Sequence, residues 1–207
     1  MAKREQLKRG QRKRPEKSVI LLGTEGKNKT EQKYYLELSL ESSNKYSLKF
    51  ANGNSTDPVG IVKDTMKDAE KMCTDPGDRA FAVFDTDTDI RKQVQVNEAV
   101  RLARNNSIEI ITSTPCFEVW FLQHFKYSTH AFNFGDEVIR ELRRYIPNYE
   151  KSNPPVEILR QDTSVAVDRA KALELYHDEQ GRQLHEINRN PSTLAHIIVE
   201  LLIDKTD

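Results

Sequence analysis

Three acidic side chains follow two short apolar runs in the first half of the chain. Glu25 comes after residues 18–23 (SVILLG), and Asp85 and Asp87 come directly after residues 79–84 (RAFAVF). Residues 18–23 have the form of a strand that is buried on both faces of a sheet, and residues 79–84 are predicted as a further strand. Ligands of open parallel sheets bind beyond the carboxyl ends of the strands. If these two strands are neighbours, we expect the three carboxylates to converge.

Converging carboxylates indicate a site for a hard cation. Like charges at close range repel each other, so the arrangement is costly unless a cation lies between them. Oxygen ligands favour Mg²⁺ or Mn²⁺, and Asp89 is a further candidate ligand beside Glu25, Asp85 and Asp87. A bound divalent ion can neutralise charge on a phosphoryl group and help to activate water. The alternative is that these aspartates only cap the helix that follows them.

A calcium-binding EF-hand loop is excluded. The run Asp85-x-Asp87-x-Asp89 begins like such a loop, which needs glycine at its sixth position and glutamate at its twelfth. This chain has Ile90 and Val96 there.

A phosphate-binding loop remains an alternative. Residues 23–30 read GTEGKNKT, and they differ from the pattern G-x-x-x-x-G-K-[ST] only at Asn28, which stands where the last glycine is required. Asparagine tolerates left-handed backbone geometry better than most residues. A nucleotidase with a degenerate phosphate-binding loop is therefore kept as a second function.

The elements that must position these residues alternate between strand and helix. Strands are predicted at 18–23, 46–51, 79–84 and 107–111, with helices between them, which is typical of βαβ units and a mostly parallel sheet. After residue 125 the pattern predicts helices and no further strand. We therefore expect an α/β fold in which a basic, disordered arm (1–17) precedes an α/β core (18–126) and a helical extension packed on that core (127–207).

Composition limits the class of protein. The 207 residues contain 32 Lys+Arg and 32 Asp+Glu, yet residues 1–17 hold eight basic and two acidic residues, so the arm carries +6 and the remainder −6. A basic arm could contact phosphates of a nucleic acid. No apolar run reaches the ~18 residues of a membrane span, and the basic N-terminus lacks the apolar segment of a secretory signal. Two cysteines give no disulfide framework. The expected location is the cytoplasm.

Four segments together resemble a known family. A strand, Glu-Gly and a helix followed by a strand ending in Asp-x-Asp is similar to the Toprim domain of topoisomerases, primases and OLD-type nucleases. More closely, TEGKNKTEQKYY, VFDTDTD, PCFEVWFLQHF and NPSTLAHIIVELL, in this order within residues 15–203, resemble the RloB-like family. The family more often reads E-G-E-K-T-E, whereas this chain has one extra residue and Lys27 in the acidic position.

This resemblance implies a metal-dependent nuclease of a bacterial antiphage, abortive-infection system that an ATPase partner controls. It implies Glu25 as the catalytic acid or base, and Asp85 and Asp87 as ligands of Mg²⁺ or Mn²⁺. The expected partners are a nucleic acid (DNA, tRNA or another RNA), the ATPase subunit and a second copy of the chain. A Toprim module that binds nucleic acid or a partner without catalysis is the alternative from another functional class.

Secondary candidates surround this set. Lys27 and Lys29 could hold phosphate near a helix N-terminus, although surface lysines are common. Glu31 is interpreted first as a helix-capping residue. Glu118 falls in the first turn of a predicted helix, where the helix dipole stabilises an anion, and the resemblance adds it to the site.

His124 is the last candidate. It shares a helix face with Phe117 and Phe121 at i, i+4, i+7 spacing, so a packed core histidine is favoured over a catalytic one.

Overall fold

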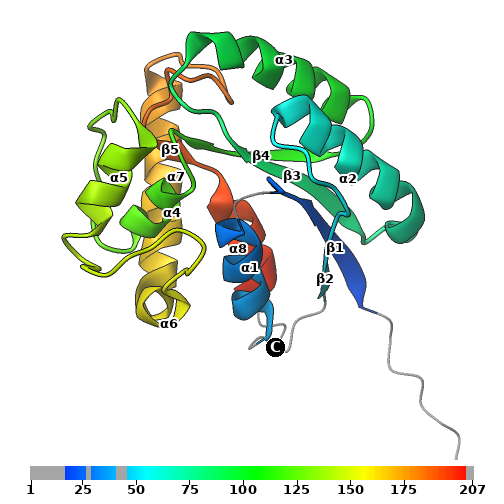
Figure 1. Cartoon of the computed structure of the whole chain (residues 1–207), viewed down its shortest axis with the longest axis horizontal. Helices are drawn as coiled ribbons and strands as arrows, with labels where there is room; N and C mark the ends of the chain where they lie inside the picture. The colour runs from blue at the N-terminus through cyan, green and yellow to red at the C-terminus, as the bar shows by residue number, and fades with distance from the viewer. Residues whose placement is uncertain (1–16, 27–28, 41–45, 204–207) are drawn as a thin grey trace, which may run out of the picture.

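The structure, a computed structural model, describes residues 17–26, 29–40 and 46–203 as an α/β fold (Figure 1). One five-stranded sheet has the order β2-β1-β3-β4-β5. The strands are β1 (Ser18–Gly23), β2 (Tyr46–Phe50), β3 (Arg79–Asp85), β4 (Glu109–Thr114) and β5 (Ser192–Thr193). β1 to β4 are parallel, and β5 pairs antiparallel with β4. The predicted fold class, a mostly parallel sheet flanked by helices with a helical C-terminal part, is confirmed.

Strand β5 corrects the expectation that no strand follows residue 125. A strand of two residues is too short to show an alternating pattern, so it is recognised only by its pairing with β4. Ser113 and Thr193 lie opposite each other, and their hydroxyls are hydrogen-bonded at 2.9 Å. The helix that follows this strand begins only at Ala195.

Helices cover both faces of the sheet. In Figure 1, α2 and α3 lie on one side of the strands, and α1 and α8 lie together on the other. The helices in chain order are α1 (Thr30–Leu40), α2 (Pro58–Met72), α3 (Ile90–Arg104), α4 (Glu118–Gln123), α5 (Gly135–Leu142), α6 (Val156–Leu159), α7 (Thr163–Glu179) and α8 (Ala195–Ile203), with a 3₁₀ turn at Arg160–Asp162. None of the helices in the described ranges is long and apolar enough to cross a bilayer.

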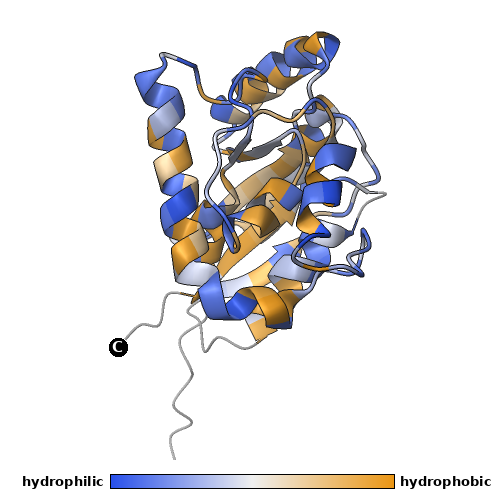
Figure 2. Cartoon of the chain, turned by 90° about the vertical axis from the view of Figure 1, so that its left-hand side faces the viewer, coloured by the Kyte–Doolittle hydropathy of each residue, from blue (hydrophilic) through white to orange (hydrophobic). Residues whose placement is uncertain are grey.

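Side chains of the buried strands contribute to two hydrophobic layers, one on each face of the sheet. Leu21 of β1 and Ala82 of β3 pack beneath α2 and α3, whereas Leu22 and Phe81 pack toward α1 and α8. This alternation follows from the period of two of a β-strand. Figure 2 shows hydrophobic residues along the sheet and the inner helix faces, with hydrophilic residues outside.

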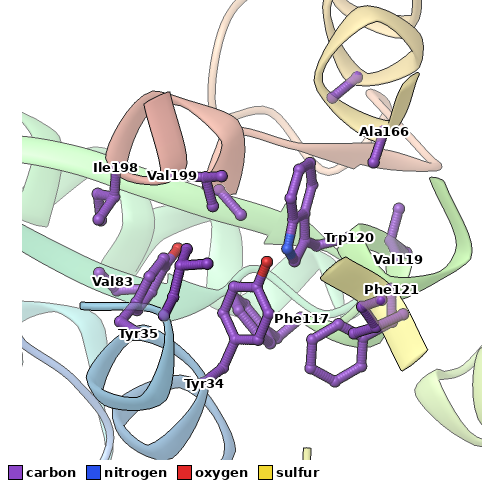
Figure 3. Close-up of a cluster of buried hydrophobic side chains, with 14 of the residues drawn as sticks. Tyr34, Tyr35, Val83, Phe117, Val119, Trp120, Phe121, Ala166, Ile198 and Val199 are labelled. Carbon is purple, nitrogen blue, oxygen red and sulfur yellow. The ribbon is translucent and has the colours of Figure 1, made fainter. Parts of the chain in front are cut away.

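An aromatic cluster fills the layer between α1 and α4 (Figure 3). Tyr34 packs edge-on against Phe117 and Trp120, with ring centroids 5.9 and 6.5 Å apart. His124 belongs to this core, because its ring lies 4.9 Å from that of Trp120 and its Nδ1 is 3.2 Å from the Trp120 carbonyl oxygen. Burial lowers the pKa of His124 to about 4, so the residue is neutral at pH 7.

The neighbouring parallel strands β1 and β3 end at the same edge of the sheet. Gly23 lies in register with Ala82, so the residues that follow both strands emerge side by side. This is the pairing on which the predicted convergence of Glu25 with Asp85 and Asp87 depends. Of the predicted basic arm, residues 1–16 lie outside the described residues.

Candidate active site at the carboxyl ends of β1 and β3

The turn after β3 is fixed by hydrogen bonds to β4. Asp85 is opposite Ser113, the Thr86 amide donates to the Ser113 carbonyl at 3.0 Å, and the hydroxyls of Thr86 and Thr114 are 2.7 Å apart. Asp87 then adopts a left-handed backbone conformation with φ of 54°, which aspartate tolerates better than most residues. The local sequence therefore holds Asp85 at the strand end and turns Asp87 outward to the rim.

The turn after β1 is held against the segment that follows β2. The Gly26 amide donates to the Ser55 carbonyl at 3.1 Å, and a Cβ on Gly26 would lie 2.7 Å from the Cα of Asn54. Glycine is thus required by the close approach of the chain to itself. This contact leaves Glu25 half-buried at the edge of the site.

Asp85 is the centre of a group of carboxylates. Its pKa lies well above the usual value, first because of burial and then because of the charges of Glu31, Glu118, Glu25 and Asp87. Four carboxylates therefore raise the pKa of Asp85. They come from three places in the fold: the β1–α1 turn with α1, the β3–α3 turn, and α4. We call these five residues the carboxylate cluster.

Glu31 is the member whose position the sequence did not predict. Its side chain is only 6% exposed although it lies in the first turn of α1, and its Oε2 has no hydrogen-bond partner among the described residues. Burial, followed by the charges of Glu118 and Glu25, raises the pKa of Glu31 to about 8 although a backbone hydrogen bond opposes the rise. A buried carboxylate with a free oxygen is what a cation site requires.

Glu118 occupies the first turn of α4, as predicted, and is 3% exposed. Its Oε1 accepts a hydrogen bond from the Tyr149 hydroxyl at 2.9 Å. Glu25 completes the group from the rim, where burial is the main cause of its raised pKa, and the charge of Asp87 adds to the rise.

Two lysines border the cluster, and no sequence pattern predicted either of them. The Lys92 ammonium, from the first turns of α3, contacts Oδ2 of Asp87. Partial burial lowers the pKa of Lys92, but the hydrogen bond with Asp87 and the charges of Asp87, Glu25 and Asp85 raise it overall. Partial burial lowers the pKa of Lys151, in the loop after α5, but the charges of nearby groups, Glu118 and Asp85 among them, raise it overall.

Other predicted site residues lie elsewhere. Asp89 is the N-cap of α3, where it accepts from the Arg91 amide at 2.9 Å and pairs with the Arg91 guanidinium. The Arg91 contacts lower the pKa of Asp89 to about 2, and Asp89 is not among the groups that act on Asp85. Lys29 is exposed just before α1, and Lys27 lies outside the described residues.

The donor set fits a hard divalent cation in chemistry, because it consists of carboxylate oxygens and includes the unpartnered Oε2 of Glu31. As the side chains lie, no three His, Cys, Asp or Glu residues of the described ranges are arranged to hold a metal ion together. Lys92 meanwhile supplies positive charge at Asp87. Side-chain rotation within the cluster would be needed to close such a site.

Comparison with known proteins identifies the family of the chain. No curated protein and no solved structure matches the chain. The model of a family described as RloB-like protein matches residues 20–202, which include the whole carboxylate cluster, both lysines and Tyr149. The chain therefore belongs to the RloB-like family.

Proposed function

We propose that this protein is a Toprim-type nuclease that hydrolyses phosphodiester bonds in nucleic acid with the help of Mg²⁺ or Mn²⁺. The observation that supports this most is the half-buried Asp85, whose pKa is raised by desolvation and by the nearby charges of Glu31, Glu118, Glu25 and Asp87. Acids that are kept close together and partly desolvated destabilise the fold, so such clusters are usually functional. A cation site at the carboxyl ends of parallel strands accounts for the cost.

Within this proposal the cluster has an inner and an outer part. Asp85, Glu31 and Glu118 would hold a metal ion, and Asp87 would hold it from the rim. When bound, such an ion neutralises charge on the phosphoryl group and lowers the pKa of a bound water molecule.

Glu25 would act as the general acid or base of the cleavage step. Its half-buried position leaves it accessible to substrate, and its raised pKa brings it nearer to neutral pH, where a general acid or base works best. The charges of Lys92 and Lys151 lower the pKa of Glu25 and so favour its ionised form.

The nucleotidase alternative has less support from the geometry. A triphosphate bound against residues 23–30 would lie close to Glu25 and to the buried Glu31, and repulsion between these anions would weaken its binding. The resemblance of this chain to defence nucleases is the ground for proposing an antiphage, abortive-infection role and control by an ATPase partner.

The decisive experiment is a cleavage assay on Glu25→Gln with Mn²⁺, on DNA and on RNA including tRNA, with and without the proposed ATPase partner. Cleavage should fall by ~10²–10⁴-fold while binding of nucleic acid persists, because glutamine keeps the size of the side chain but cannot exchange the proton. Glu98→Gln, an exposed position on α3, is the matched control and should retain full activity.

Equal cleavage by Glu25→Gln and the parent would contradict the assignment of Glu25. A parent that binds nucleic acid but cleaves none of the substrates, even with the ATPase, would favour the non-catalytic binding module. Tight ATP binding by the isolated chain would favour the nucleotidase.

A further inference from the structure

A hollow of about 590 Å³ lies beside α5, and one of its lining residues, Lys151, also interacts with Glu118 and Asp85 of the carboxylate cluster. Its walls are formed by Ile139 and five charged residues: Asp136, Arg140, Arg143, Glu150 and Lys151. We call it the α5 hollow. Arg140, Arg143 and Lys151 are exposed, so their charged groups are available to a ligand.

The hollow opens beside the cluster because the loop after α5 is fastened to the start of α1. The Ser152 amide donates to the Thr30 hydroxyl at 2.9 Å, and the Lys33 ammonium donates to the Ser152 carbonyl at 2.5 Å. Lys151, one residue earlier, is thereby held where its charge acts on Glu118 and Asp85. The same side chain lines the hollow, so Lys151 is common to both.

Arg143 is held in place by the same loop. Its Nε donates to the Tyr149 carbonyl at 3.1 Å, while the Tyr149 hydroxyl donates to Glu118. The terminal nitrogens of Arg143 are thus carried on a fixed stem. A guanidinium presents donors in a fork that matches the oxygens of a phosphate, and one hydrogen bond through Nε leaves most of that fork free.

The charged residues that line the hollow include more cations than acids, unlike the cluster beside it. Three cations face two acids, Asp136 and Glu150, whereas the cluster consists of five carboxylates. A polyanion would be repelled from the cluster and attracted to the cations next to it. This pattern suits a substrate with repeated phosphates, of which one lies at the reacting position and its neighbours lie in the hollow.

We propose that the α5 hollow binds the sugar–phosphate backbone of the nucleic-acid substrate next to the bond that is cut, with Arg140, Arg143 and Lys151 on its phosphates. This inference rests on the proposed function and adds a substrate-positioning site to it. Lys151 would hold the phosphate nearest the carboxylates, and the two arginines those further along the strand. Contacts to phosphate would fix the register of the strand without reading its sequence.

The test uses the full chain in a Glu25→Gln background, in which the probe survives. Arg140→Gln and Lys151→Gln are introduced singly and together, and binding of labelled single-stranded DNA and RNA is measured by fluorescence anisotropy with Ca²⁺ between about 50 and 300 mM salt. Lys63→Gln, an exposed lysine on α2 across the sheet, is the charge-matched control. Unchanged circular-dichroism melts establish that the variants are folded.

The double variant should bind at least ~10-fold more weakly, and the slope of log affinity against log salt should be lower by about 1.4, because each lost phosphate contact on a single strand removes ~0.7. Lys63→Gln should change neither. Equal affinity and slope in the double variant and its parent would overturn the inference, as would a parent that does not bind these probes.

Failure of the inference can be told apart from failure of the proposed function. Cleavage in Mn²⁺ is measured on the same variants with Glu25 intact. If cleavage is unchanged in these variants but still depends on Glu25, the inference about the α5 hollow is wrong and the proposed nuclease function stands. If no chain cleaves, but the parent binds nucleic acid in a salt-dependent way and the double variant does not, the α5 hollow is a nucleic-acid site. The proposed nuclease function is then wrong.

Discussion

The hydroxyl of Tyr149 donates a hydrogen bond to Oε1 of Glu118 across 31 positions of sequence, at 2.9 Å. This contact joins the loop after α5 to the first turn of α4. Both side chains are buried, and the negative charge of Glu118 raises the pKa of Tyr149 after the contribution of burial. The hydroxyl therefore stays protonated and remains a donor to Glu118.

Tyr149→Phe should destabilise the protein by about 1.5–3 kcal/mol, because a buried carboxylate loses a charge-assisted donor. The free energy of unfolding in urea, with EDTA present, measures this. Tyr145→Phe is the control, since its ring is half-exposed and stacks on Phe125 at a centroid distance of 4.9 Å. Equal stability of the two variants would mean that Glu118 does not depend on Tyr149.

Sequence patterns predicted the parts of the site that lie directly at strand ends. Asp85 and Glu25 follow apolar runs, and the topology of a parallel sheet brings such positions together. Glu31 could not be placed in the same way, because a glutamate in a first helical turn has the same pattern whether it caps the helix or is buried. Lys92 and Lys151 have no pattern at all. Their positions depend on packing between segments remote in sequence.

Asp85→Asn should weaken binding of Mn²⁺ by about tenfold or more, a loss of about 1.4 kcal/mol or more, because Asp85 is the residue on which the other four carboxylates act. Titration calorimetry measures this directly. Asp89→Asn is a sharp comparison, since asparagine is as good an N-cap as aspartate and α3 should be unaffected. We expect its affinity to equal that of the parent. A weaker affinity in Asp89→Asn would return Asp89 to the metal site.

Lys92→Met should raise the affinity for Mn²⁺ several-fold at low salt, because it removes the positive charge that competes at Asp87. The gain should shrink as ionic strength rises. Stability without metal should change by less than about 1 kcal/mol, since Lys92 and Asp87 are each 43% exposed. Lys67→Met on the outer face of α2 controls for the loss of a lysine. A lower affinity would show instead that Lys92 orients the carboxylates for the ion.

Glu31→Gln should remove a pH dependence of stability. The pKa of Glu31 is about 8 in the folded protein, whereas its ordinary value of 4.5 applies in the unfolded chain. Between these two pH values the folded state therefore binds more protons than the unfolded state. Raising the pH through this window therefore destabilises the metal-free protein, by up to about 1.4 kcal/mol per unit from this one group, and the loss is complete above pH 8. Glutamine carries no proton to lose.

The measurement is urea unfolding in EDTA between about pH 5 and 9. Relative to the parent, Glu31→Gln should gain stability as the pH rises, whereas Glu37→Gln, exposed on the same helix, should follow the parent. Divalent metal should abolish the difference in slope, because an ion bound to ionised Glu31 displaces the proton that the metal-free protein holds. Parallel curves for parent and Glu31→Gln without metal would mean that Glu31 is already ionised in the folded state and that its neighbours tolerate the charge unaided.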